Sequence, residues 1–112
     1  MAETAPLEIL PTDLASRLKS DAPPPLIDCR EPREVEIAMI EGAKVIPMSE
    51  IGDRLPELEE LKPVEFVVYC HHGARSASVA NWLRAHGFDG ARSLSGGIDE
   101  WSRDVDPSMR RY

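Results

Sequence analysis

The stretch "EFVVYCHHGARSASVANWLRAH", residues 65–86, joins an apolar run to a helical pattern through a short loop. The segment from Phe66 to Tyr69 is continuously apolar, which is typical of a strand buried on both faces in the middle of a parallel sheet. The helical part carries one apolar stripe, formed by Val79, Ala80 and Leu83. A buried strand followed directly by an amphipathic helix indicates a parallel α/β arrangement.

The helix that follows the loop has a defined end in the sequence. Gly87 fits a left-handed terminator, and Phe88 can fold back on Leu83 in a Schellman geometry. We therefore expect this helix to cover residues 74–86.

Further strands and helices alternate on both sides of this stretch. We expect short strands at residues 7–10, 25–28, 43–47 and 92–94. We expect helices near residues 12–18, 32–40 and 96–104, the first capped by Thr12, and a short broken helix capped by Ser49. Together with the central strand, this pattern predicts a three-layer α/β/α domain around a mostly parallel sheet of five strands.

Length and composition restrict the classes of function. A chain of 112 residues fits one domain, and we expect a single domain over residues 1–112 with its core at about 7–104 and short tails. The formal net charge of −7 disfavours binding to nucleic acid or to an anionic membrane surface. No apolar run approaches the ~20 residues of a membrane span, and the start lacks the features of a signal peptide. With two cysteines, a disulfide framework is not expected, and the reducing cytoplasm is the expected location.

The loop after the central strand combines a thiol with basic side chains. Cys70 is expected at the carboxyl end of the strand, where parallel sheets bind their ligands. The next helix begins a few residues later, and the free N–H groups at its start favour an anion such as a thiolate. Arg75 adds a permanent positive charge, and His71 and His72 add more when they are protonated. Gly73 permits a sharp turn and a close backbone approach to a ligand. This combination predicts a reactive thiol.

Other interpretations of these residues are open at this stage. An isolated cysteine is usually a small core residue, although the position before a basic glycine-containing loop favours reactivity. His71 and His72 are conceivable zinc ligands, but neither Cys29 nor His86 completes the paired spacing of a structural zinc site, so no metal is expected. Arg75 has two equal interpretations, a contact to substrate or a surface ion pair.

Three motifs resemble the rhodanese family of sulfurtransferases. The segment "CHHGARSASVANWLRAHGF" (70–88) is similar to the active-site loop and following helix of that family. The segment "LIDCREPREVEIAMIEGAKVIP" (26–47) is similar to its stretch with Asp-x-Arg, Glu-Pro and Gly-Ala before a strand ending in Ile-Pro. The segment "LSGGIDEW" (94–101) is similar to its Gly-Gly-x-x-x-Trp motif. The resemblance covers about residues 7–104, with the motifs in the family's order.

The resemblance implies a five-stranded parallel sheet flanked by helices, and a persulfide intermediate on Cys70. Sulfur would pass from thiosulfate or a related donor to cyanide, a thiol or a sulfur-carrier protein, with no cofactor. The closing segment "VDPSMRRY" (105–112) is similar to the tails of rhodanese domains fused to enzymes that activate sulfur-carrier proteins. The residues expected to hold the transferred sulfur are those of the loop, namely His71, His72, Gly73, Ala74 and Arg75, and those expected to support it are Asp28, Arg30 and Ser76.

Two other functions are alternatives to a sulfurtransferase. Some dual-specificity phosphatases share the rhodanese fold, but four residues separate Cys70 from Arg75 and the phosphatase loop has one more. A six-residue loop suits a single sulfur atom better than a tetrahedral phosphate. The second alternative is a non-catalytic binding module, which is common for this fold when the cysteine is lost, whereas Cys70 is present here.

Residues outside the loop have structural interpretations. Cys29 follows the expected strand at 25–28, which in the family lies beside the strand that ends at Cys70. A disulfide between the two cysteines is geometrically possible, but a packed thiol is favoured. Trp82 and Trp101 are expected to be packing residues.

Overall fold

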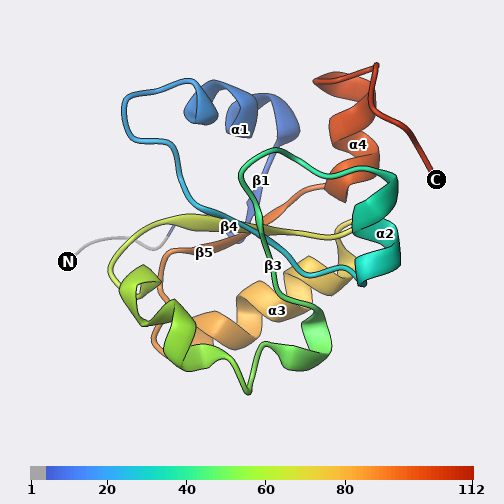
Figure 1. Cartoon of the computed structure of the whole chain (residues 1–112). Coiled ribbons are helices and arrows are strands. Elements are labelled where there is room, and N and C mark those ends of the chain that lie inside the picture. Colours follow the sequence, from blue (N-terminus) through green and yellow to red (C-terminus); the bar gives the residue numbers. More distant parts are fainter. Residues whose placement is uncertain (1–4) are drawn as a thin grey trace.

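The computed structural model describes residues 5–112, and a five-stranded sheet lies at its centre (Figure 1). The strand order is β1-β5-β4-β2-β3, and every pair of neighbours is parallel. The predicted parallel sheet of five strands is therefore confirmed. The strands are β1 (Glu8–Ile9), β2 (Leu26–Asp28), β3 (Lys44–Val45), β4 (Phe66–Tyr69) and β5 (Ala91–Leu94).

Helices cover both faces of the sheet, as Figure 1 shows, with α1 and α4 on one side and α3 on the other. Two 3₁₀ helices, η1 and η2, follow β3. The three-layer α/β/α architecture expected from the sequence is thus present. The helices are α1 (Pro11–Leu18), α2 (Pro32–Ile37), η1 (Met48–Glu50), η2 (Leu55–Leu61), α3 (Ala74–Ala85) and α4 (Gly97–Asp104).

The central strand β4 separates two apolar cores. Phe66 and Val68 point to the core beneath α3, while Val67 and Tyr69 point to the core beneath α1 and α4. All four side chains are fully buried, since alternate residues of a strand face opposite sides of the sheet. Burial on both faces explains why this segment is continuously apolar in the sequence.

Proline changes the start of two helices relative to expectation. Helix α1 begins at Pro11 with Leu10 as its N-cap residue and no side-chain cap, so the predicted cap by Thr12 is wrong. Proline fits the first helical position because its missing N–H would have had no intrahelical partner there. Ser49 lies inside η1, which follows Pro47 without a side-chain cap, so the predicted cap by Ser49 is also wrong.

Helix α3 ends as the sequence predicts. Gly87 has a φ of 95°, and its N–H bonds the carbonyl of Arg84 at 3.2 Å. The N–H of Phe88 bonds the carbonyl of Leu83 at 3.0 Å, which completes the Schellman pattern. Within residues 5–112, no helix has both the length and the apolar character that crossing a membrane requires.

Candidate active site

The loop between β4 and α3 turns the chain in four residues, 70–73. Cys70 directly follows β4, and α3 starts at Ala74 with Gly73 as its N-cap residue. Gly73 has a φ of 104°, a left-handed conformation that side-chain-bearing residues rarely adopt. The turn therefore places Cys70 directly beneath the N-terminus of a twelve-residue helix.

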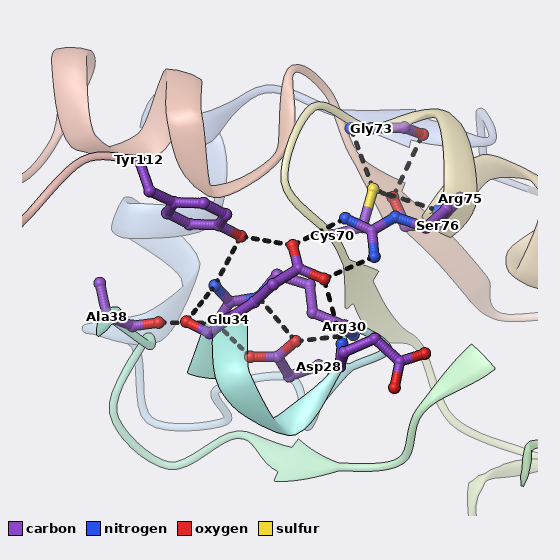
Figure 2. Close-up of polar contacts among 10 residues, drawn as sticks. Asp28, Arg30, Glu34, Ala38, Cys70, Gly73, Arg75, Ser76 and Tyr112 are labelled. Atoms are coloured by element: carbon purple, nitrogen blue, oxygen red, sulfur yellow. Dashed lines mark hydrogen bonds and ion pairs between the residues drawn. The ribbon is translucent and has the colours of Figure 1, made fainter. Parts of the chain in front are cut away.

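The sulfur of Cys70 lies among hydrogen-bond donors (Figure 2). The N–H of Gly73 donates to Sγ at 3.0 Å, and the N–H of Ser76 does so at 3.4 Å. The Ser76 hydroxyl oxygen lies 3.5 Å from the same sulfur. Backbone donors and a helix N-terminus together favour negative charge on a sulfur in this position. The arrangement can hold a thiolate, or an anionic sulfur bonded to it.

Ser76 fixes the first turn of α3 to the neighbouring strand. Its hydroxyl shares a hydrogen bond of 2.7 Å with the hydroxyl of Ser93 in β5, and it donates to the carbonyl of Gly73 at 3.2 Å. Both serines are fully buried. Ser76 therefore joins the loop to β5.

The carbonyl groups of the loop are bonded to the start of α4. The N–H of Ile98 donates to the carbonyl of Cys70 at 2.8 Å, and the N–H of Asp99 donates to that of His71 at 3.0 Å. Gly97 lies against the same two carbonyl oxygens, and a Cβ at this position would collide with both. The structure shows that α4 engages the loop carbonyls, which leaves loop N–H groups available to the sulfur.

Arg75 forms an ion pair with α2 (Figure 2). Its Nη1 and Nη2 donate to Oε1 and Oε2 of Glu34 at 2.8 and 2.9 Å. These hydrogen bonds hold the pKa of Glu34 at about 2, below its ordinary value of 4.5. The ion pair that the sequence offered as one interpretation of Arg75 is therefore present, and its partner could not be identified from local patterns.

Asp28 and Arg30 form a fully buried ion pair at the end of β2. Arg30 Nε donates to Asp28 Oδ1 at 2.9 Å, and Nη2 donates to the carbonyl of Ala38 at 2.7 Å. Its Nη1 donates to the hydroxyl of Tyr112 at 2.9 Å. A buried charge needs such complete pairing. The polar contacts of Asp28 and Arg30 are therefore mostly local, and they extend to the C-terminal segment through Tyr112.

Tyr112 packs against the loop between β4 and α3, a contact that the sequence analysis missed. Its ring stacks on His71 with centroids 3.8 Å apart and an interplanar angle of 11°. Its hydroxyl donates to Glu34 Oε2 at 2.8 Å, so that Glu34 bridges Tyr112 and Arg75. Burial lowers the pKa of His71, and the neighbouring His72 acts in the same direction. His71 is therefore a weaker source of positive charge than the sequence suggested.

His71, His72 and Asp99 place their potential ligand atoms within 4.8 Å of one another. Asp99, however, already pairs with Arg103 at 3.3 Å and with Arg111 at 3.0 Å. Two fixed positive charges on the only carboxylate of this cluster oppose the binding of a divalent cation.

Cys29 lies one strand away from Cys70 and is equally buried, with 1% of its surface exposed. The two thiols belong to the same apolar core. Burial raises the pKa of Cys29 to about 12, and the charges of Cys70 and Asp28 act in the same direction. Cys29 is a packed thiol, as the sequence analysis favoured.

Trp101 packs in the apolar core, whereas Trp82 packs against His86 at the surface of α3. Trp82 is 39% exposed and lines a shallow apolar pocket of about 310 Å³ between η1 and α3. The sequence alone does not show whether a tryptophan at this position of the helix faces the core or the solvent.

Comparisons with known proteins identify relatives of this chain. The family model for the rhodanese-like domain matches residues 10–104. The rhodanese-like/PpiC domain-containing protein 12 of Arabidopsis thaliana chloroplasts is 44% identical over 89 residues, covering 78% of this chain and 30% of the relative. A protein of Allochromatium vinosum named sulfurtransferase is 35% identical over 96 residues, covering 86% of this chain and 88% of the relative.

Solved structures give the same result. A rhodanese-like domain protein from Staphylococcus aureus superimposes with a TM-score of 0.80 at 30% identity, covering 94% of this chain and 97% of that one. The chain spans only 30% and 26% of the length of the first two curated relatives that it matches. The fold, the family model and these relatives agree over nearly the same residues, and the chain accordingly belongs to the rhodanese-like domain family, whose members include sulfurtransferases.

Proposed function

We propose that this protein is a sulfurtransferase that moves a sulfane sulfur from thiosulfate or a related donor to a thiophilic acceptor through a persulfide on Cys70. The observation that carries the proposal is the position of Cys70 Sγ, 3.0 Å from the N–H of Gly73 and 3.4 Å from that of Ser76, beneath the N-terminus of α3. The relative from Allochromatium vinosum, which matches over most of its length, is named a sulfurtransferase.

The proposed reaction has two half-reactions. In the first, the Cys70 thiolate attacks the outer sulfur of thiosulfate, and the bond between the two sulfur atoms of the donor breaks, with its electron pair leaving on sulfite. In the second, a nucleophilic acceptor attacks the outer sulfur of the persulfide, and Cys70 leaves as a thiolate. This is covalent catalysis by an activated nucleophile, for which ping-pong kinetics are expected. Cyanide, a small thiol and a sulfur-carrier protein are the acceptors that we propose.

The roles of the neighbouring residues follow from their contacts. We assign donor binding to the loop, namely His71, His72, Gly73, Ala74 and Arg75, through its backbone N–H groups and the Arg75 charge. We assign the support of that loop to Ser76, which is hydrogen-bonded to β5, and to the Asp28–Arg30 pair, which holds the Tyr112 hydroxyl while the Tyr112 ring stacks on the loop. The chemistry needs no cofactor, because the transferred sulfur is carried by the protein's own thiol. A reducing compartment such as the cytoplasm suits a reaction of this kind.

The size of the loop supports sulfur rather than phosphate as the transferred group. The two N–H donors converge on the single Sγ atom at hydrogen-bond distance, with no residue between Gly73 and the start of α3. A tetrahedral phosphate needs donors arranged around three oxygens that lie further from the nucleophile. The intact thiol among these donors also weighs against a purely non-catalytic module.

Intact-mass spectrometry after incubation with thiosulfate tests the proposal. We expect a gain of one sulfur atom that is removed by cyanide with formation of thiocyanate. Cys70→Ser should neither gain the sulfur nor form thiocyanate, since a hydroxyl cannot form the persulfide, whereas Cys29→Ala should do both. A folded Cys70→Ser protein with substantial turnover, or a wild type that gains no sulfur, would show that the proposal is wrong.

A further inference from the structure

Cys29 and Cys70 occupy matching positions at the carboxyl ends of two adjacent strands. The parallel ladder between β2 and β4 pairs Asp28 with Tyr69, and the two cysteines are the next residues on each side. The N–H of Cys29 donates to the carbonyl of Tyr69 at 3.0 Å, so the strands remain in register up to this point. Neighbouring strands lie ~4.8 Å apart, which falls within the ~4.4–6.8 Å between Cα atoms that a disulfide spans.

The two thiols also lie on the same face of the sheet. Both belong to the apolar core on the α3 side, together with Phe66 and Val68, whereas Tyr69 between them faces the opposite core. Each cysteine is 1% exposed. A reagent in solution therefore has little access to Cys29, while the sulfur of Cys70 is its neighbour inside the protein.

The surroundings of Cys29 make it a slow nucleophile. The charged and titratable groups that act on it are Cys70 at the end of β4, Asp28 on β2 and Arg75 on α3. Burial raises the pKa of Cys29 to about 12, and it is consequently a neutral thiol near pH 7. The rate of thiol–disulfide exchange falls with the thiolate fraction of the attacking group. An external acceptor that reaches the loop is thus favoured over Cys29.

We propose that Cys29 resolves the Cys70 persulfide when no acceptor is present, giving a Cys29–Cys70 disulfide and hydrogen sulfide. The sulfur of Cys29 attacks Sγ of Cys70, a bond forms between these two atoms, and the bond from Cys70 to the outer sulfur breaks. The outer sulfur leaves with the electron pair and takes the proton of the Cys29 thiol. Cys29 is oxidised and the sulfane sulfur is reduced to sulfide, so no further oxidant is required.

The loop assists this step, because the sulfur leaves from Cys70 Sγ, which accepts the Gly73 N–H beneath the N-terminus of α3, and a helix N-terminus favours a departing anion. The resulting disulfide blocks Cys70 until a dithiol reductant opens it. The inference rests on the proposed function, since it requires the persulfide. It adds a second outcome for that intermediate, in which sulfide is released rather than transferred.

The experiment follows the fate of the persulfide under anaerobic conditions. The full chain is loaded with thiosulfate, freed of excess donor and held without acceptor, while intact mass and released sulfide are recorded. Thiols are then blocked and the protein is digested with trypsin without reductant. We expect sulfide to appear together with a protein that is two hydrogen atoms lighter than the reduced, unloaded form. The digest should then contain the peptide of residues 20–30 linked to that of residues 55–75.

Two substitutions serve as matched controls. Cys29→Ser and Cys29→Ala should load the persulfide and transfer it to cyanide, but lose it roughly tenfold or more slowly when no acceptor is present. Their melting temperatures establish that the core is intact. Equal decay in the wild type and both variants, or decay without the linked peptides, would overturn the proposal.

Failure of the proposed function gives a different result. The wild type then gains no sulfur from thiosulfate, and the persulfide that Cys29 would resolve does not form. Oxidation of the reduced protein with diamide shows separately whether Cys29 and Cys70 can form a disulfide. A linked peptide formed by diamide, together with a stable persulfide in the wild type, would reject the resolving step while leaving sulfur transfer intact.

Discussion

Glu34 and Arg75 connect α2 to the first turn of α3 through two parallel hydrogen bonds of 2.8 and 2.9 Å. The positive charge nearest to the loop is thus matched by a carboxylate, and Tyr112 donates to the same carboxylate at 2.8 Å. Because the donor proposed for this site is an anion, the balance of charge within the pair should govern how well the donor binds.

Arg75→Gln should lower kcat/KM for thiosulfate by roughly 5- to 150-fold, corresponding to about 1–3 kcal/mol. The substitution removes the positive charge and leaves the Glu34 carboxylate facing a doubly charged anion. A steady-state thiocyanate assay at low ionic strength measures the effect, and iodoacetamide alkylation of Cys70 against pH separates loss of donor binding from loss of thiolate. An unchanged kcat/KM would mean that the loop backbone alone binds the donor.

Glu34→Gln should change kcat/KM for thiosulfate in the opposite direction. It leaves Arg75 without its neutralising partner and should raise kcat/KM for thiosulfate about 2- to 5-fold, because a single charge at ~4 Å contributes ~1 kcal/mol in water. The gain should shrink as salt is added. Glu57→Gln is the matched control, since Glu57 pairs with Arg54 in an exposed contact on η2. A gain of the same size in the control would point to the net charge of the protein rather than to the Glu34–Arg75 pair.

The stability of the protein in acid should depend on Glu34. Its pKa in the folded state is about 2 and its ordinary value is 4.5, so the folded state favours the charged form. This contribution is fully present above pH 4.5 and is lost as the pH falls from there toward 2. Urea unfolding of the wild type and Glu34→Gln at several pH values should show the wild type losing its advantage over that window. A difference in the free energy of unfolding that stays constant with pH would contradict this.

Gly97→Ala should lower the free energy of unfolding by roughly 1–3 kcal/mol. It should also reduce the rate of sulfur transfer in the protein that remains folded. The residue has a φ of 63° and lies against the carbonyl oxygens of Cys70 and His71, so a methyl group must displace the loop. Gly52→Ala is the control, because its added Cβ would meet only Trp82 at an ordinary 3.9 Å. Thermal unfolding and the thiocyanate assay check both variants, and an active, fully stable Gly97→Ala protein would refute the close approach.

Lengthening the loop by one glycine between Gly73 and Ala74 should weaken sulfur transfer by roughly 100- to 1,000-fold, comparable to losing one donor of an oxyanion hole. The insertion separates the start of α3 from the Cys70 sulfur, to which the Ser76 N–H now donates at 3.4 Å. The unmodified protein should hydrolyse aryl phosphates negligibly. Robust phosphatase activity in it would invalidate the argument from loop size.

The sheet and the central helix could be predicted because their signals are local. The apolar run of β4 reflects burial on both faces, and Gly87 with Phe88 marks the end of α3 within a few residues of chain. The predicted caps at Thr12 and Ser49 failed for an equally local reason, since a preceding proline starts each helix without a side-chain cap.

The contacts around the loop could not be predicted because they join segments far apart in the chain. Arg75 and Glu34 are separated by 41 positions, and Tyr112 and Glu34 by 78. A single arginine is compatible with many partners, and a tyrosine in a terminal segment carries no periodic signal. Only the folded chain determines which carboxylate lies opposite the guanidinium and which imidazole lies under the phenol ring.

The hydrogen bonds from Ile98 and Asp99 to the carbonyls of Cys70 and His71 bear on attempts to transplant this site. Residues 70–76 copied into another parallel fold would bring the thiol and its neighbours. They would lack the N–H donors that hold the loop carbonyls pointing away from the sulfur. The smallest graft that preserves the polarity of the loop consists of two pieces, residues 70–76 and residues 96–99, with the recipient providing a helix start at the position of the second. A scaffold chosen by its strand and helix alone would present the sulfur with carbonyl oxygens as readily as with N–H groups.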